Sequence, residues 1–134
     1  MSYRETEGPA PVVVVALGGH VFGLDRRTGA RLWEHEVGGR FARIAVTADR
    51  VLAAGVRLLC LEYPTGALLW TADLPWTAWT LLWSGGQILV AGSGEVACYS
   101  ELGEQLWHDG FRGYGLSAVA LGLPGVVAEA DVSG

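Results

Sequence analysis

A repeat of 37 residues runs through this 134-residue chain and is marked by three tryptophans, Trp33, Trp70 and Trp107. Each tryptophan ends a similar ten-residue phrase, which reads LDRRTGARLW, LEYPTGALLW and CYSELGEQLW in chain order. No single helix or strand repeats over so long a distance, so the period indicates one supersecondary unit copied along the chain. The repeat therefore constrains the architecture of this protein more than any other feature.

Within one period, short apolar runs alternate with turn residues, which is typical of a meander of antiparallel strands. In the second copy we expect four strands, at residues 41–47, 50–54, 56–63 and 67–73. No segment carries a capped apolar pattern with a 3.6-residue period, so we predict essentially no helix.

The turn between the third and fourth strands carries a glycine in every copy: Gly29, Gly66 and Gly103. Glycine at this place fits a backbone with positive φ, where a side chain would be strained. Asp25 or Glu62, just before the turn, is expected to accept hydrogen bonds from the turn amides.

Antiparallel units of four strands, repeated about every 40 residues, are the blades of a β-propeller. A large flat side chain at a recurring strand position fills the space between neighbouring blades, so we expect Trp33, Trp70 and Trp107 to be structural. Burying an indole removes ~150–250 Å² from water. Its truncation to alanine should then cost ~3–5 kcal/mol.

The repeated phrase resembles that of the PQQ-like propellers, a group named for quinoprotein alcohol dehydrogenases that also includes outer-membrane assembly propellers. The resemblance covers residues 12–110 and is weaker in the third copy, where Tyr99 and Leu102 replace an acidic residue and a threonine. We expect a looser hairpin there. Enzymes of the family bind the quinone with a calcium ion, a catalytic aspartate and, in many, a vicinal disulfide. This chain lacks an adjacent cysteine pair and a matching acidic cluster, so the resemblance implies no catalytic residue and no cofactor.

The copies divide the chain into an N-terminal tail at 1–11, repeats at about 12–37, 38–74 and 75–111, and a partial repeat at 112–130. The first copy has no room for its first strand, whereas 115–121 and 126–130 align with a surplus first and second strand. This pattern predicts a partial propeller that head-to-tail association completes. A six-blade homodimer, a pseudo-eight-blade dimer with incomplete seam blades, and a partner chain that supplies the missing blades all remain open.

The composition agrees with an apolar interface, since 51% of residues are hydrophobic. The net charge of the chain is −5. The negative charge argues against a nucleic-acid partner. The uncharged stretch 74–94 could suggest a membrane span, but its glycines and its alignment with 37–57 predict two strands and a turn. Cys60 and Cys98 are not equivalent in the gapless alignment, and we expect reduced thiols in a cytoplasmic protein.

Four residues in loops between blades are candidates for a binding rim: Arg40, Trp76, Arg112 and Tyr114. Arginine and aromatic residues are the types that anchor protein interfaces. Trp76 is the tryptophan of its loop that we expect to be exposed, whereas Trp79 and Trp83 should be core. The three histidines have no metal-ligand spacing, and no metal site is expected.

The function predicted from these features is a non-catalytic propeller that acts as a protein–protein interaction scaffold. The alternative is a propeller that binds carbohydrate or another small ligand through its rim aromatics. An enzyme is the third possibility, and no catalytic motif supports it.

Overall fold

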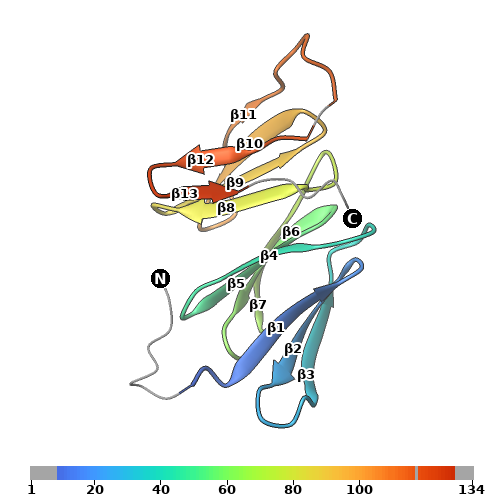
Figure 1. Ribbon diagram of the computed structural model, residues 1–134, viewed down its shortest axis with the longest axis vertical. Coiled ribbons are helices and arrows are strands. Elements are labelled where there is room, and N and C mark those ends of the chain that lie inside the picture. The colour runs from blue at the N-terminus through green and yellow to red at the C-terminus, as the bar shows by residue number, and fades with distance from the viewer. Residues whose placement is uncertain (1–8, 117, 129–134) are drawn as a thin grey trace.

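The computed structural model describes residues 9–116 and 118–128, and every regular element in these ranges is a β-strand (Figure 1). The first sheet holds β1 (Val12–Leu17), β2 (His20–Asp25) and β3 (Arg31–Glu36). The second holds β4 (Arg43–Val46), β5 (Arg50–Ala54), β6 (Arg57–Glu62) and β7 (Leu68–Asp73). The third holds β8 (Thr80–Ser84), β9 (Gln87–Gly92), β10 (Glu95–Ser100) and β11 (Gln105–Asp109). The last pairs β12 (Leu121–Leu123) with β13 (Val126–Ala128).

Each sheet is a meander in which strands that follow one another in sequence pair antiparallel. The sheets follow one another in a curved row along the long axis (Figure 1), which is the arrangement of neighbouring propeller blades. The prediction of an all-β partial propeller is therefore confirmed. In the first sheet β1 pairs with β2 as β5 pairs with β6, and the described residues place no strand on the outer edge of β1.

Two hydrophobic cores lie between the three blades, one at each junction, and the middle blade contributes to both. Val51 and Ala53 of β5 face the first blade, whereas Leu52 and Ala54 face the third. Side chains alternate across a strand, so a strand that is buried on both faces reads as a continuous apolar run. This explains why β5 and β6 are nearly uninterrupted in hydrophobic residues.

Backbone hydrogen bonds also join successive blades. The Val56 amide of the second blade donates to the Val37 carbonyl (3.0 Å) after the first, and the Ala78 amide before the third blade donates to the Gly55 carbonyl (2.8 Å) of the second. The buried hydroxyl of Tyr63 also donates to the Val12 carbonyl (2.8 Å) of the first blade. These bonds fix the position of one blade relative to the next.

The third blade corrects our gapless alignment. Trp70 lies opposite Cys60 and Trp107 lies opposite Cys98, so the two cysteines are equivalent in the fold. The turn between β9 and β10 is one residue longer than its counterpart, and the next hairpin is one residue shorter. Because the two changes cancel before Trp107, the period of 37 residues hides them.

The third hairpin is also tighter than predicted, not looser. The Ser100 hydroxyl oxygen accepts from the amides of Leu102 and Glu104, both at 3.2 Å, in place of the missing acidic residue. In the first copy Asp25 Oδ1 accepts from the Arg27 amide (2.8 Å), as expected. Glu62 instead accepts from the hydroxyl of Thr65 (2.6 Å).

The predicted first strand at 115–121 is wrong, because β12 begins at Leu121. The turn at Pro124–Gly125 lies two residues later, relative to Trp107, than Gly85–Gly86 lies relative to Trp70. The preceding loop is therefore longer than its counterparts. It returns to the third blade where the Thr80 hydroxyl donates to the Val119 carbonyl (2.6 Å). Residues 129–130 of the predicted second strand, like 1–8 of the predicted tail, lie outside the described residues.

The uncharged stretch 74–94 forms β8 and β9 around the Gly85–Gly86 turn, as predicted. The part of the chain that the structure describes contains no helix that could span a membrane.

Candidate functional site

The repeated tryptophan forms a joint with the next blade. The Trp33 indole Nε1–H donates to the carbonyl oxygen of Pro64 (3.0 Å), and the Trp70 Nε1–H donates to the carbonyl oxygen of Glu101 (2.8 Å). Both acceptors lie two residues before the glycine of the neighbouring hairpin turn. The two bonds join equivalent groups one repeat apart.

The turn glycine is the second half of this joint. Gly66 and Gly103 have φ of 76° and 89°, which strains a residue with a side chain. A Cβ on Gly66 would overlap the indole ring of Trp33, and a Cβ on Gly103 would lie 2.8 Å from the ring of Trp70. Glycine is therefore needed at this position for two reasons: the positive φ of the turn and the close approach of the indole.

Trp107 has the same place in the third blade but a different environment. It is 45% exposed, and no described residue accepts a hydrogen bond from its indole. Gly29, the turn glycine of the first blade, is open in a matching way, because an added Cβ would meet no atom within 4 Å. One half of a joint is thus exposed at each end of the row of blades.

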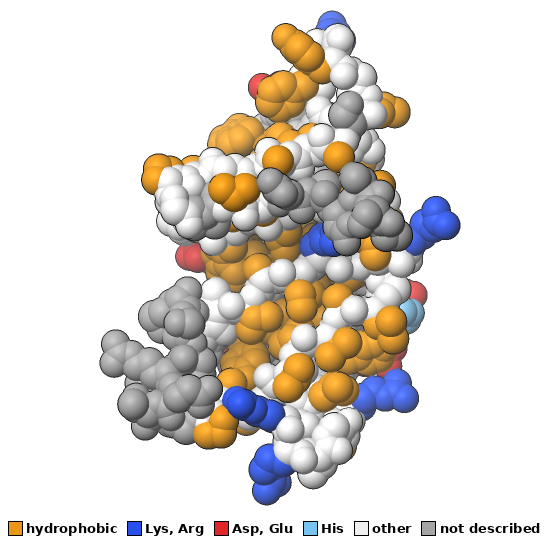
Figure 2. Space-filling view, viewed as in Figure 1, with side chains coloured by type: hydrophobic (Ala, Val, Ile, Leu, Met, Phe, Trp, Pro, Cys, Tyr) orange, Lys and Arg blue, Asp and Glu red, His pale blue; other side chains and the backbone are white. Residues whose placement is uncertain are grey.

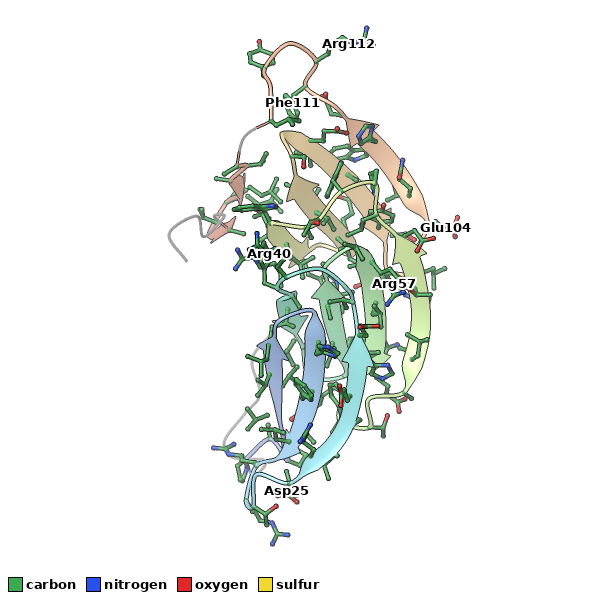
Figure 3. The ribbon with its side chains drawn as sticks, turned by 90° about the vertical axis from the view of Figure 1, so that its right-hand side faces the viewer. Asp25, Arg40, Arg57, Glu104, Phe111 and Arg112 are labelled. Carbon is green, nitrogen blue, oxygen red and sulfur yellow. The ribbon has the colours of Figure 1, made fainter. Side chains whose placement is uncertain are left out.

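The four residues of the predicted rim do not form one patch. Arg40 lies near the middle of the molecule, whereas Arg112 lies at its far end on the loop after β11 (Figure 3). Tyr114, on that same loop, is 81% exposed. Arg112 and Tyr114 lie in one loop, and Arg40 lies two connecting loops earlier in the chain.

Trp76 is half-buried. It packs against the core between the second and third blades, and a Cβ on Gly92 would lie 2.8 Å from its ring. Trp83 packs against the same core as predicted, and its Nε1–H donates to Glu101 Oε2 (2.9 Å). Trp79 meets the ring of Phe41 edge-on, with 5.5 Å between the ring centroids.

The loop 110–116 exposes two further large side chains that sequence reasoning missed, Phe111 and Leu116. Phe111 has a φ of 44°, which is unusual for a bulky residue. Its amide donates to Asp109 Oδ1 (2.9 Å), and the Tyr114 amide donates to the Phe111 carbonyl (3.2 Å). The density of large residues in 111–116 is the sequence signal that could have identified this loop.

Each of the three histidines has a partner of its own. His108 Nε2 lies 2.6 Å from Glu95 Oε1, His20 Nδ1 lies 3.2 Å from Glu34 Oε2, and His35 Nε2 lies 2.7 Å from a backbone oxygen. Among the described residues no three metal-ligating side chains cluster together. Burial raises the pKa of the Cys60 and Cys98 thiols, which disfavours the reactive thiolate.

Comparison with known families shows the family to which the repeat belongs. The profile of a family described as outer membrane protein assembly factor BamB matches residues 55–132, more than half of the chain. The chain belongs to this PQQ-like repeat family. No curated protein sequence matches it.

Solved structures show the same fold at low sequence identity. A quinohemoprotein alcohol dehydrogenase from Pseudomonas putida HK5 is 19% identical with a TM-score of 0.58, over 75% of this chain and 19% of that one. BamB from Moraxella catarrhalis is 20% identical with a TM-score of 0.56, over 84% of this chain and 36% of that one. This chain therefore spans less than half the length of either protein, one named as an enzyme and the other as an assembly factor.

Proposed function

We propose that this chain is a non-catalytic propeller module that serves as a protein–protein interaction scaffold, with the loop 110–116 as its partner contact. The observation that carries the proposal is the concentration of exposed large side chains in that loop. Tyr114 and Leu116 are 81% and 84% exposed, and Phe111 is 45% exposed. Aromatic residues and arginine are enriched where protein interfaces gain most of their binding energy.

The loop is ordered although it is exposed. The Asp109 carboxylate and the turn at Phe111–Tyr114 fix its backbone, and the positive φ of Phe111 is held by that structure. A strained residue persists only where its surroundings determine its conformation. A pre-ordered loop loses less conformational entropy when a partner binds, which favours association.

The family relationship supports the general role. The family takes its description from BamB, which is by name an assembly factor. A rigid stack of blades that displays variable loops suits a scaffold. The carbohydrate-binding alternative would use the rim aromatics, of which Trp76 packs over Gly92 and Tyr114 is exposed.

The proposal is tested by affinity capture from cells that express the native chain, a loop variant or a control variant. The loop variant carries Tyr114→Ala and Leu116→Ala. The control carries Leu102→Ala, which removes a side chain of similar exposure (76%) on a different turn. We expect one protein to be recovered in near-equimolar amount with the native chain and the control, and to be lost with the loop variant. Equal recovery with all three would contradict the role of the loop.

A further inference from the structure

The two ends of the row of blades are complementary. The first blade exposes a turn glycine with open space above it, and the third blade exposes a tryptophan without an acceptor for its indole among the described residues. In the interior, Trp33 with Gly66 and Trp70 with Gly103 show how these two parts fit together. The same fit between two molecules would join Trp107 of one to Gly29 of another.

The surface around Gly29 has the shape and chemistry of the interior joint. A shallow hollow of about 380 Å³ is lined by residues of the first blade: Val15, Leu17, Phe22, Leu24, Gly29 and Arg31. Phe22 and Leu24 hold the places that Leu59 and Leu61 hold one repeat later. Leu59 and Leu61 are buried against the first blade, whereas Phe22 and Leu24 are only half-buried. The first blade thus leaves open the face that the second blade buries.

Figure 2 shows hydrophobic side chains gathered over β1 and the neighbouring strands. Val13 and Leu17 of β1 are 45% and 68% exposed, although both belong to an apolar strand. A hollow and an exposed apolar face of this kind mark an interaction site. The edge of β1 is also unpaired among the described residues, so it can accept a strand as well as a side chain.

We propose that a second copy of this chain docks head-to-tail, with its Trp107 in the hollow of the first blade. The indole ring packs on Gly29, and the indole Nε1–H donates to the carbonyl oxygen of Arg27, the residue two positions before that glycine. The occupant is another copy of this chain because the internal repeat already shows this tryptophan face and this hairpin turn fitting each other. Two copies joined at both ends close a ring of six blades, within the range of ~4–8 that propellers use.

Closure requires one strand to change its partner. β13 holds the second-strand place beside β12, and β1 holds that place in the first sheet. In the closed ring β12 pairs with β1 of the second copy, and this β1 displaces β13 from the edge of β12. Among the described residues three pairs join β12 to β13, whereas six join β1 to β2, so the shorter pairing is the one exchanged.

The self-association and the proposed partner contact fail independently, since they use the ends of the row and the loop 110–116 respectively. The association is measured by sedimentation velocity on the native chain and three variants. Trp107→Ala removes the inserted side chain, and Leu17→Asp places a charge in the hollow. Leu68→Asp places the same charge on a half-exposed leucine of β7 outside the hollow. Circular dichroism verifies that each variant folds.

We expect the native chain and Leu68→Asp to sediment as two 14.2 kDa subunits. Trp107→Ala and Leu17→Asp each damage both junctions of a closed ring and should weaken association about 100-fold or more, because buried tryptophans at interfaces contribute strongly. An equimolar mixture of the two variants contains pairs with one intact junction. Its association should therefore be tighter than that of either variant alone.

Recovery in the mixture is specific to a head-to-tail contact, since a symmetric contact between identical patches would not be restored. A native chain that remains a single subunit at about 100 μM would overturn the proposal. Association of Trp107→Ala with native affinity, or a mixture no better than its components, would do the same. If the chain closes its ring only with a different protein, the native chain alone will sediment as a single subunit, which is the first of these contradicting results.

Discussion

Trp33 and Trp107 hold the same place in their own blades, yet Trp33 is half-buried against the next blade and Trp107 is exposed. Trp33 lies on Gly66 and donates to Pro64, whereas Trp107, on β11 of the last complete blade, is 45% exposed. Each blade therefore completes its own hydrogen-bonded sheet without enclosing its tryptophan. The tryptophan joins one blade to the next, and stability in such a repeat is approximately a sum of blade terms and junction terms.

The largest effect expected from this comparison is the loss of an internal tryptophan. Trp33→Ala or Trp70→Ala should lower the free energy of unfolding by ~3–5 kcal/mol, because a packed, hydrogen-bonded indole is removed from a junction. Trp107→Ala should cost less than about 1 kcal/mol, because surface substitutions have small effects. Urea denaturation in the Leu17→Asp background measures the difference without a contribution from association. Equal losses at all three positions would show that each tryptophan stabilises its own blade.

A smaller difference is expected between turn glycines. Gly29 and Gly66 have nearly the same φ, 77° and 76°, so alanine strains both backbones alike by about 1 kcal/mol. At Gly66 the new methyl group must also displace the Trp33 indole, which should add ~1–3 kcal/mol. Thermal denaturation of the two alanine variants isolates the junction. If both alanine variants lost the same stability, the close approach of the indole to Gly66 would contribute nothing measurable to the free energy of unfolding.

The smallest effect concerns the two thiols, which lie opposite the tryptophans of the second and third blades. Burial raises the pKa of both above the ordinary cysteine value, so each should react slowly with an alkylating reagent near pH 8. Trp107→Ala exposes Cys98, lowers its pKa toward the ordinary value and should speed its alkylation several-fold. Cys60 serves as the internal control, because Trp70 still covers it. Mass spectrometry after partial labelling reads both sites, and parallel acceleration of Cys60 would indicate general loosening.

Much of this fold was predictable because the repeated residues reflect the backbone conformation that each position of the blade requires. The positive φ of Gly29, Gly66 and Gly103 follows from a turn that only glycine adopts without strain. The positions of the tryptophans follow from their regular spacing. The paired length changes in the third blade were not predictable from that spacing, because they cancel within one period. Ser100, a turn residue beside the missing acid, was the available signal.

The candidate site was less accessible to sequence reasoning. Arg40, Trp76 and Arg112 occupy corresponding loops in the alignment, but the third loop is two residues longer and follows its own path. Trp76, in the loop between β7 and β8, lies over Gly92 at the end of β9 because that glycine leaves room for a ring. The Pro124–Gly125 dipeptide marks the true turn of the last hairpin and could have corrected the strand boundary.

The most direct test of the junction is the hydrogen exchange of the indole N–H groups, followed by NMR on protein labelled with ¹⁵N-tryptophan. In the Leu17→Asp variant, Trp33 and Trp70 should be protected by their carbonyl acceptors, whereas Trp107 should exchange rapidly. In the native chain at the same concentration, Trp107 should become protected as well, because Gly29 of a second copy encloses it. Rapid exchange of Trp107 in native protein that sediments as a dimer would contradict the account, as would rapid exchange of Trp33 or Trp70 in either sample.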